Sequence, residues 1–254
     1  MGKYWKFHKF GGSSLADTDC FRRVAELMLA EPGEQTGVVV SAMGGMTDAL
    51  LGLVSFAAAD DAGYLDGLDA IGERYEGTAT ALLRGEARSR LLDAWREDAE
   101  DVRDVLKAIA LVRAAPVRSR DVVSGYGEIW SARMLAALLE QEDPARGGTW
   151  VDARKVITVR HTELGPTVLW DASSARFGEV VPADFSGIAV FTGFIASDEE
   201  GLQTTLGRNG SDFSAAILAA LANASELSIW TDVDGVMSAD PRRVPEARVI
   251  DRLT

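Results

Sequence analysis

The sequence predicts an α/β protein built as a three-layer α/β/α sandwich, with helices on both faces of a mostly parallel central sheet. Two patterns along its 254 residues support this prediction. Short apolar runs bounded by turn residues are typical of buried strands, and they alternate with longer segments whose apolar residues recur every three or four positions, as in helices. No internal repeat and no linker rich in proline and serine interrupts the alternation, so we expect one domain over residues 1–254.

The first elements follow one another in strand–helix order. Residues 4–10 alternate apolar and polar side chains, which indicates a strand, and residues 17–29 place apolar side chains on one side of a helix. Residues 37–41, Gly-Val-Val-Val-Ser, are expected to form a buried strand, and residues 48–59 a helix. Ligands of such sheets bind beyond the carboxyl ends of the strands, so the loops after these strands are where we expect a site.

A long helical segment then separates the early strands from the later ones. Apolar residues recur at helical spacing from Leu91 to Ile109, and we interpret residues 66–113 as a helical insertion that Pro116 ends. The remaining elements that we expect are a helix at 128–140, strands at 149–151, 156–159, 187–192 and 202–206, a polar turn at 197–201, a helix at 211–222 and a buried strand at 227–231.

Charge and composition exclude several classes of protein. Lysine and arginine number 26 against 39 aspartate and glutamate residues, a net charge of −13, which repels DNA and anionic membranes. No apolar run approaches the roughly 20 residues of a membrane-spanning helix, and the N-terminus lacks the apolar core of a signal peptide. The single cysteine, Cys20, excludes an internal disulfide. We therefore expect a cytoplasmic protein that binds neither nucleic acid nor membrane. It would hold any phosphate locally, through glycine N–H groups, helix N-termini, single lysine or arginine side chains and a divalent metal ion.

Several familiar catalytic signatures are absent from the chain. It has no G-x-x-x-x-G-K-[ST] phosphate loop, no G-x-G-x-x-G fingerprint, and neither G-x-S-x-G nor H-E-x-x-H. We interpret His8, in an expected strand, and His161, in an expected loop, as structural or solvated rather than catalytic. Cys20 falls within an expected helix and is interpreted as a small buried apolar residue.

Five polar clusters remain as candidates, and each also has a purely local explanation. Residues 9–14, Lys-Phe-Gly-Gly-Ser-Ser, combine a cation with glycine amides that can approach phosphate, or they form only a tight turn. Residues 41–47, Ser-Ala-Met-Gly-Gly-Met-Thr, repeat the device before a helix N-terminus, which attracts anions, or they only cap that helix through Thr47.

The other three clusters add charged side chains. Residues 124–128, Ser-Gly-Tyr-Gly-Glu, place a carboxylate at a helix start, where it either caps the helix or binds an ammonium group. Residues 206–212, Leu-Gly-Arg-Asn-Gly-Ser-Asp, offer an arginine that can fork onto a carboxylate and an aspartate that can hold a lysine, or they form a turn and a cap. Residues 231–237 and 240–242 suit a nucleotide and Mg²⁺, although Asp-Gly turns are common for local reasons.

Taken in order, the five clusters resemble those of aspartate kinases, in the amino acid kinase superfamily. Residues 9–14 resemble the N-terminal signature of that family, and residues 204–212 and 230–236 resemble its later signatures. Arg-Asn-Gly-Ser-Asp at 208–212 and Gly-Glu-Ile-Trp-Ser-Ala at 127–132 are most similar to the kinase module of bifunctional aspartokinase–homoserine dehydrogenases. The resemblance spans nearly the whole chain.

The resemblance implies transfer of the γ-phosphoryl group of Mg-ATP to the β-carboxylate of L-aspartate, which gives 4-phospho-L-aspartate, the first step towards lysine, threonine and methionine. The catalytic residues that it implies are Lys9 and Asp212. For L-aspartate it implies Ser41, Thr47, Glu128 and Arg208. For ATP it implies Gly11, Gly12, Ser13, Thr231, Asp232, Met237, Asp240 and Arg242. It implies no protein-built metal site, and we expect a homo-oligomer.

Two departures from the family pattern affect these expectations. Family members often have an aromatic residue where Met237 stands, and they continue beyond Thr254 with a helix, a lysine-bearing segment and usually ACT domains. We therefore expect a kinase domain that is incomplete at its C-terminus, has no ACT or dehydrogenase domain, and leaves a sheet edge exposed. Two alternatives stay open: a related kinase with another acceptor, such as glutamate or carbamate, and a non-catalytic nucleotide-binding or dimerising module.

Overall fold

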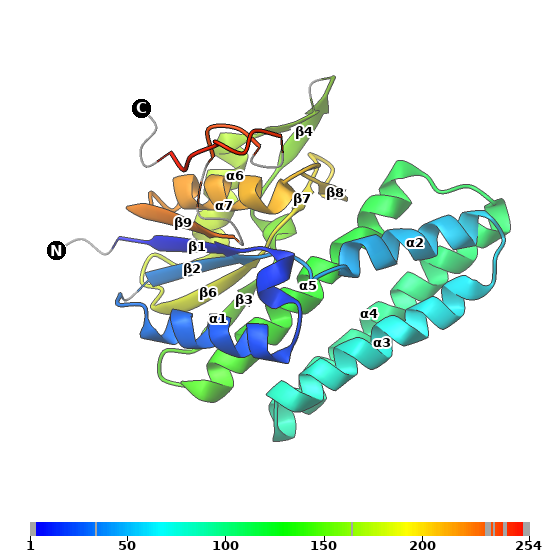
Figure 1. Ribbon diagram of the computed structural model, residues 1–254, viewed down its shortest axis with the longest axis horizontal. Coiled ribbons are helices and arrows are strands. Elements are labelled where there is room, and N and C mark those ends of the chain that lie inside the picture. The colour runs from blue at the N-terminus through cyan, green and yellow to red at the C-terminus, as the bar shows by residue number, and fades with distance from the viewer. Residues whose placement is uncertain are drawn as a thin grey trace.

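Five parallel strands form the central sheet of the computed structural model, which describes residues 4–33, 35–163, 165–231, 235, 237–240 and 243–250. The strands are β1 (Lys6–Phe10), β2 (Gln35–Val40), β3 (Gly148–Val151), β6 (Gly187–Thr192) and β9 (Glu226–Trp230). Their order across the sheet is β3-β6-β2-β1-β9, and every neighbouring pair is parallel. The predicted parallel sheet between helical layers is confirmed (Figure 1).

Helices cover both faces of this sheet (Figure 1). One face carries α1 (Thr18–Ala30) and α5 (Val117–Glu142), and the other carries α6 (Trp170–Val180) and α7 (Gly210–Leu221). The central strand β2 shows why its sequence is an unbroken apolar run. Val38 and Val40 belong to the hydrophobic cluster beneath α1 and α5, whereas Val39 belongs to the cluster beneath α7. A strand that is buried on both faces has no side for polar residues.

A helical bundle extends from one end of the sheet, as Figure 1 shows. It consists of α2 (Met46–Ala58), α3 (Gly63–Leu82), α4 (Gly85–Val112) and part of α5. The insertion predicted at 66–113 is therefore a pair of helices, and Pro116 is the residue before α5. Tyr75, Trp95 and Trp130 form an aromatic core in the bundle, with ring centroids 5.8 to 6.2 Å apart. None of the described helices has the length and hydrophobicity to cross a membrane.

Two small antiparallel hairpins replace strands that the sequence analysis placed differently. Of the strand expected at 156–159, only Thr158, in an isolated bridge to Ser197, and Val159, the first residue of the next strand, are paired, and a short 3₁₀ helix at Ala153–Lys155 precedes them. The next hairpin pairs β4 (Val159–Thr162) with β5 (Gly165–Val168), so His161 lies in a strand and not in a loop. The strand expected at 202–206 is β8 (Gln203–Thr205), and it pairs with β7 (Ile195–Ser197).

Burial differs from expectation at the edge of the sheet. β9 was predicted to be buried, but among the described strands only β1 pairs with it, and Ile229 and Trp230 are 50% and 39% exposed. Cys20 is half-buried in α1 and not fully buried as expected. His8 is buried, and its Nδ1 accepts a hydrogen bond of 3.2 Å from Trp230 Nε1, which fits a structural role.

Candidate active site

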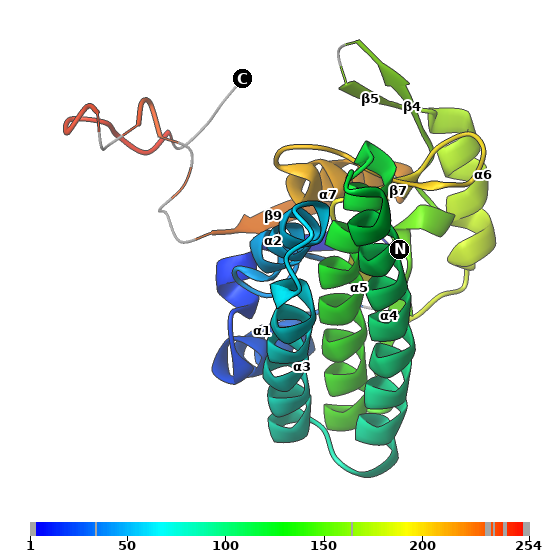
Figure 2. The ribbon, with the colours of Figure 1, turned by 90° about the vertical axis from the view of Figure 1, so that its right-hand side faces the viewer.

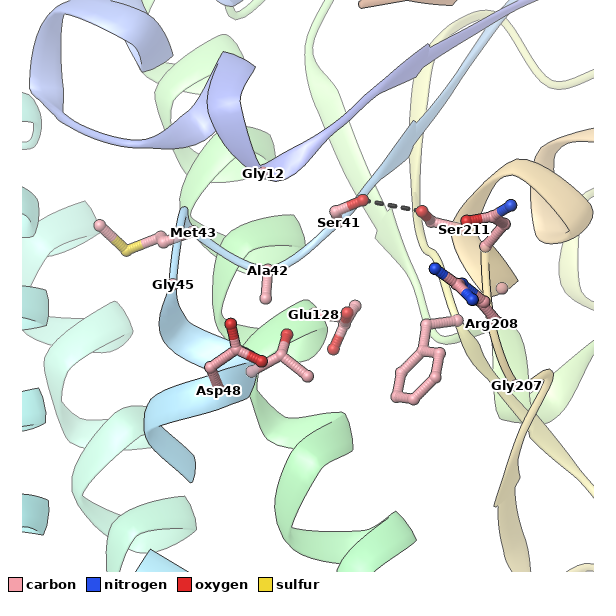
Figure 3. Close-up of a pocket in the computed structure, with 14 residues that line it drawn as sticks. Gly12, Ser41, Ala42, Met43, Gly45, Asp48, Glu128, Gly207, Arg208 and Ser211 are labelled. Carbon is pink, nitrogen blue, oxygen red and sulfur yellow. Dashed lines mark hydrogen bonds between the residues drawn. The ribbon is translucent and has the colours of Figure 1, made fainter. Parts of the chain in front are cut away.

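A cavity of about 360 Å³ opens at the carboxyl ends of the central strands (Figure 3). The loops that follow β1, β2 and β6 meet there with α2, α5 and the turn before α7. The predicted site residues that line the cavity are Gly12, Ser41, Thr47, Glu128 and Arg208. Segments that are far apart in the sequence therefore converge on one place, at the sheet edge where ligands of this architecture bind.

Lys9 lies at the end of β1, beside the cavity, with its ammonium group at the first turn of α7. The residue is buried, and its Nζ lies 2.8 Å from Oδ1 of Asp212. An ammonium group has three N–H donors, so Lys9 can pair with Asp212 and still donate to a ligand. A Cβ at Gly11 would lie 3.5 Å from this Nζ. The structure thus places the predicted catalytic pair together, next to the first glycine loop.

Glycines let the loops after β1 and β2 touch. A Cβ at Gly12 would lie 3.1 Å from the carbonyl oxygen of Ala42, and a Cβ at Gly44 would lie 3.1 Å from the carbonyl oxygen of Gly12. Side chains at these positions would push the loops apart. Ser41 Oγ donates to Ser211 Oγ at 2.8 Å, which ties the end of β2 to the start of α7 (Figure 3).

The turn before α7 presents Arg208 to the cavity. Gly207 and Asn209 flank it with left-handed backbone, at φ of +73° and +56°, which glycine and asparagine tolerate better than other residues. The N–H of Gly210 donates to the carbonyl of Gly207 at 3.0 Å and closes the turn. Arg208 is exposed and lines the cavity, where its guanidinium can fork onto a carboxylate. The adjoining helix N-terminus can receive an anion.

Glu128 is the buried carboxylate of the cavity. It is 4% exposed, and burial raises its pKa to about 8, against a smaller lowering by the backbone N–H groups of Ala42 and of Glu128 itself. Within the described residues its Oε2 has no hydrogen-bond partner. Figure 3 shows Glu128 and Arg208 on opposite sides of the cavity. A buried carboxyl group that lacks a partner and faces a cavity is suited to bind a cation.

The position of Glu128 corrects the sequence interpretation of residues 124–128. They do not form a loop or open a helix, because α5 begins at Val117 and runs through them. Gly127 is there for packing: a Cβ at this position would lie 2.8 Å from the Cβ of Ala42. The explanation of Glu128 as a helix cap is therefore wrong.

Sequence reasoning missed two residues that line the cavity, Asp48 and Phe194. Asp48 is an exposed carboxylate in the first turn of α2, and acidic residues are so common at that position that it gave no signal. Phe194 follows β6 and has a φ of +65°, which is unusual for a bulky residue. Its only signal in the sequence was its place two residues after a predicted strand.

The residues predicted for ATP are only partly gathered. Gly12 lines the main cavity, whereas Ser13 and Thr231 line a second hollow of about 340 Å³ on the α1 side of the sheet. The rings of Phe10 and Trp230 also line this hollow and stack with their centroids 5.5 Å apart. Two adjacent hollows, one on each side of the end of β1, therefore share the first glycine loop.

The remaining predicted ATP residues follow β9. Met237 and Asp240 line neither hollow, and Figure 2 shows their segment extending away from the body of the fold. Asp232 and Arg242 lie outside the described residues. Over the described part of the chain, no group of three or more histidine, cysteine, aspartate or glutamate side chains could hold a metal ion. An Mg²⁺ ion carried by nucleotide phosphates needs no such group, since phosphate and water supply most of its ligands.

Comparison with known proteins gives a consistent result. The model of the amino acid kinase family matches residues 5–254. The chain is 39% identical over 256 residues to bifunctional aspartokinase/homoserine dehydrogenase 1, chloroplastic, of Arabidopsis thaliana, covering 100% of this chain and 28% of that protein. It is 34% identical to lysine-sensitive aspartokinase 3 of Escherichia coli (strain K12), covering 96% of this chain and 53% of that protein. The chain thus spans between about a quarter and a half of these relatives.

Solved structures show the same likeness. The crystal structure of E. coli aspartokinase III in complex with aspartate and ADP matches with a TM-score of 0.85 and 30% identity, over 98% of this chain and 54% of that chain. The same enzyme in complex with lysine and aspartate matches with a TM-score of 0.81, over 96% of this chain and 53% of that chain. The fold of this chain is therefore shared with these proteins.

Proposed function

Because the chain belongs to the amino acid kinase family, we propose that it acts as an aspartate kinase, which transfers the γ-phosphoryl group of Mg-ATP to the β-carboxylate of L-aspartate. One observation carries the proposal. Glu128, a buried carboxylate, and Arg208, an exposed guanidinium, share a cavity beside Lys9, which Asp212 holds at the end of β1. Such a set can bind both backbone charges of an amino acid and leave a cation beside its side chain. The aspartokinases among the relatives, one of them solved with aspartate and ADP, support this choice of acceptor.

The acceptor would meet opposite charges at both ends of its backbone. Its α-ammonium group would donate to Glu128, which supplies the missing partner of Oε2 and offsets the cost of a buried charge. Its α-carboxylate would accept two parallel hydrogen bonds from the guanidinium group of Arg208. Ser41 and Thr47 line the same cavity, and their hydroxyl groups would donate to carboxylate oxygens.

Catalysis would rest on positioning and on charge neutralisation. Lys9 would stabilise the charge on the transferring phosphoryl group, and Asp212 would orient Lys9. The backbone N–H groups of Gly11 and Gly12 would approach phosphate oxygens closely, because neither residue has a side chain in the way. The β-carboxylate of aspartate is already ionised at pH 7. It would attack the γ-phosphorus directly, ADP would leave, and no general base would be required.

The nucleotide would lie across the first glycine loop. Ser13 and Thr231 would contact it from the second hollow. The segment after β9 would contact it through Asp232, Met237, Asp240 and Arg242. Mg²⁺, bound to the phosphates of ATP, would neutralise their charge. A cytoplasmic location fits the single cysteine. We also propose a homo-oligomer, which gel filtration tests directly.

Trapping the product with hydroxylamine tests the proposed reaction. The protein is incubated with Mg-ATP, hydroxylamine and either L-aspartate or L-glutamate, and the acyl hydroxamate is measured against a reaction without ATP. Hydroxamate with aspartate alone supports the proposal. Hydroxamate with glutamate points instead to a kinase with another carboxylate acceptor, and ATP binding without any hydroxamate points to a non-catalytic module.

A further inference from the structure

His8 is a buried titratable group that the proposed mechanism does not use. It stands in the middle of β1 and is 5% exposed. Its Nδ1 accepts a hydrogen bond of 3.2 Å from Nε1 of Trp230, and its Nε2 lies 3.9 Å from Oε2 of Glu31 at the end of α1. The indole N–H can only donate, so Nδ1 must carry no proton. The bond to Trp230 therefore requires a neutral imidazole with its proton on Nε2.

The surroundings of His8 favour this neutral form. Burial lowers the pKa of the imidazole below its ordinary 6.5, and this effect is larger than the opposing attraction of Glu31 and of Glu226 on β9. Lys6, on the same strand, lowers the pKa further and pairs with Glu31 at 2.8 Å. Near neutral pH, the His8 ring is therefore an acceptor for the indole.

Trp230 is the last residue of the edge strand β9. Among the described strands β9 pairs with β1 alone, so no described strand supports this residue from the other side. Its ring is 39% exposed and stacks on Phe10 with ring centroids 5.5 Å apart. Stacking permits a ring to slide, whereas a hydrogen bond is directional. His8 therefore contributes the contact that fixes the orientation of the indole.

The indole lies beside residues that are proposed to contact the nucleotide. It lines the second hollow together with Ser13 and Thr231, and Thr231 follows it directly in the chain. The main cavity, which would hold the acceptor, is lined by neither His8 nor Trp230. A change in the orientation of the indole would therefore reach the nucleotide side of the site and leave the acceptor side alone.

We propose that His8 is a positioning residue for the nucleotide, because its hydrogen bond holds Trp230 and, through it, Thr231. The inference rests on the proposed function, in which ATP lies across the first glycine loop and contacts Ser13 and Thr231. His8 itself touches no substrate. Its protonation would place an N–H group opposite the N–H of Trp230, and the repulsion between two donors would release the indole. The affinity for ATP would then fall at acidic pH.

Three substitutions test the hydrogen bond from both of its ends. His8→Leu removes the acceptor, whereas Trp230→Phe removes the donor and keeps an aromatic ring to stack on Phe10. His8→Asn keeps an acceptor, because the side-chain oxygen of asparagine can stand where Nδ1 stands. Trp170→Phe, which changes an exposed tryptophan on α6, is the matched control.

The hydroxamate assay gives kcat and the KM values for ATP and L-aspartate, calorimetry gives the affinity for Mg-ATP, and melting temperature reports folding. We expect His8→Leu and Trp230→Phe each to raise the KM for ATP and to weaken ATP binding by about 3- to 10-fold, the ratio that corresponds to one neutral hydrogen bond. The two changes together should cost no more than either alone. The KM for L-aspartate should stay within twofold of the wild type. His8→Asn and Trp170→Phe should match the wild type.

The pH profile separates positioning from a merely structural role. As pH falls from 7 to 5, the affinity of the wild type for ATP should fall relative to that of His8→Asn, which has no titrating group at this position. The titration of ATP is common to both proteins and cancels in this ratio. A ratio that stays constant overturns the release of the indole by protonation.

The remaining outcomes distinguish this inference from the function on which it rests. The inference is overturned if Trp230→Phe keeps the wild-type affinity for ATP within twofold, if His8→Asn behaves as His8→Leu does, or if the KM values for ATP and L-aspartate rise together. If His8→Leu does not fold, Trp230→Phe decides the test. A wild-type protein that binds ATP without forming hydroxamate overturns the proposed reaction, and calorimetry then still decides the inference. A wild-type protein that does not bind ATP overturns both.

Discussion

Replacing Glu128 with glutamine should change how the stability of the protein depends on pH. Burial raises the pKa of Glu128 to about 8 in the folded protein, whereas its ordinary value is 4.5. Between these values the folded state keeps a proton that the unfolded chain has released. The free energy of unfolding of the wild type therefore falls as pH rises from 4.5 to about 8, and it stops falling above that. Glutamine has a similar shape and no charge, so the variant lacks this loss.

The size of the effect follows from the two pKa values. They differ by about 3.5, and each pKa unit corresponds to about 1.36 kcal/mol, which gives about 5 kcal/mol. Solvent that entered the adjoining cavity would reduce part of the free-energy penalty of the ionised carboxylate. We therefore expect the variant to gain about 2 to 4 kcal/mol on the wild type between pH 5 and pH 8.5.

Urea unfolding, followed by tryptophan fluorescence from pH 5 to pH 9, measures this difference. All other titrating groups are common to the two proteins, so their contributions cancel in the comparison. Glu140→Gln, at an exposed position of the same helix, is the control for replacing a carboxylate with an amide, and its stability should differ little from that of the wild type. If the curves of the wild type and Glu128→Gln run parallel, the carboxylate is ionised throughout, and the reasoning from burial is wrong.

The same proton links Glu128 to its proposed ligand. An α-ammonium group binds the ionised carboxylate, so the affinity for L-aspartate should rise with pH up to about 8 and level off above it. Near pH 7, binding should release close to one proton. Calorimetry in buffers of different ionisation enthalpy counts this proton, and its absence would show that the ammonium group binds elsewhere.

Two further predictions concern charge and packing. Lys9→Met should keep the fold and lower the rate of acyl phosphate formation by about 100-fold or more, because a preorganised charge is lost. The exposed control, Lys107→Met, should keep full activity. Retained turnover in Lys9→Met would show that Lys9 does not have its proposed role. Gly127→Ala should destabilise the protein by about 1 to 3 kcal/mol, because its Cβ would overlap that of Ala42. Gly77→Ala, at an open and exposed position of α3, should stabilise it by about 0.5 to 1 kcal/mol. Equal effects of the two alanines in chemical denaturation would refute the packing argument.

The sheet was predictable because its strands carry a local signal. Residues 187–192 form β6 with the expected bounds, and β2 was missed by only a few residues, since both strands are apolar runs buried on two faces. β9 was also predicted as a buried strand, yet among the described strands none pairs with its outer edge, and Ile229 and Trp230 are exposed. An apolar run shows that a strand suits burial, but it does not show which elements cover the strand.

The site was predictable where its residues stand at strand ends, and less so where they act through packing. Lys9 and Arg208 belong to glycine-rich sequence patterns that indicate a binding loop. The structure places Lys9 beside the cavity and Arg208 in its lining. Phe194 belongs to no comparable pattern. It is distinguished by its backbone conformation, with a φ of +65°, which the sequence does not display. A phenylalanine after a strand is ordinary until its φ is known.

The glycines of α5 show why the helix was misplaced by the sequence analysis. Glycine costs about 1 kcal/mol in a helix interior, and the sequence analysis started the helix at Glu128, after the two glycines. The structure gives each of them a contact that excludes a side chain: a Cβ at Gly125 would lie 2.3 Å from Nε2 of Gln203, and one at Gly127 would lie 2.8 Å from the Cβ of Ala42. The helix accepts the propensity cost because only a bare backbone lets the loop after β2 and strand β8 close over it. Glu128 follows Gly127 on the same helix, and its burial there raises the pKa on which the proposed recognition of an ammonium group depends.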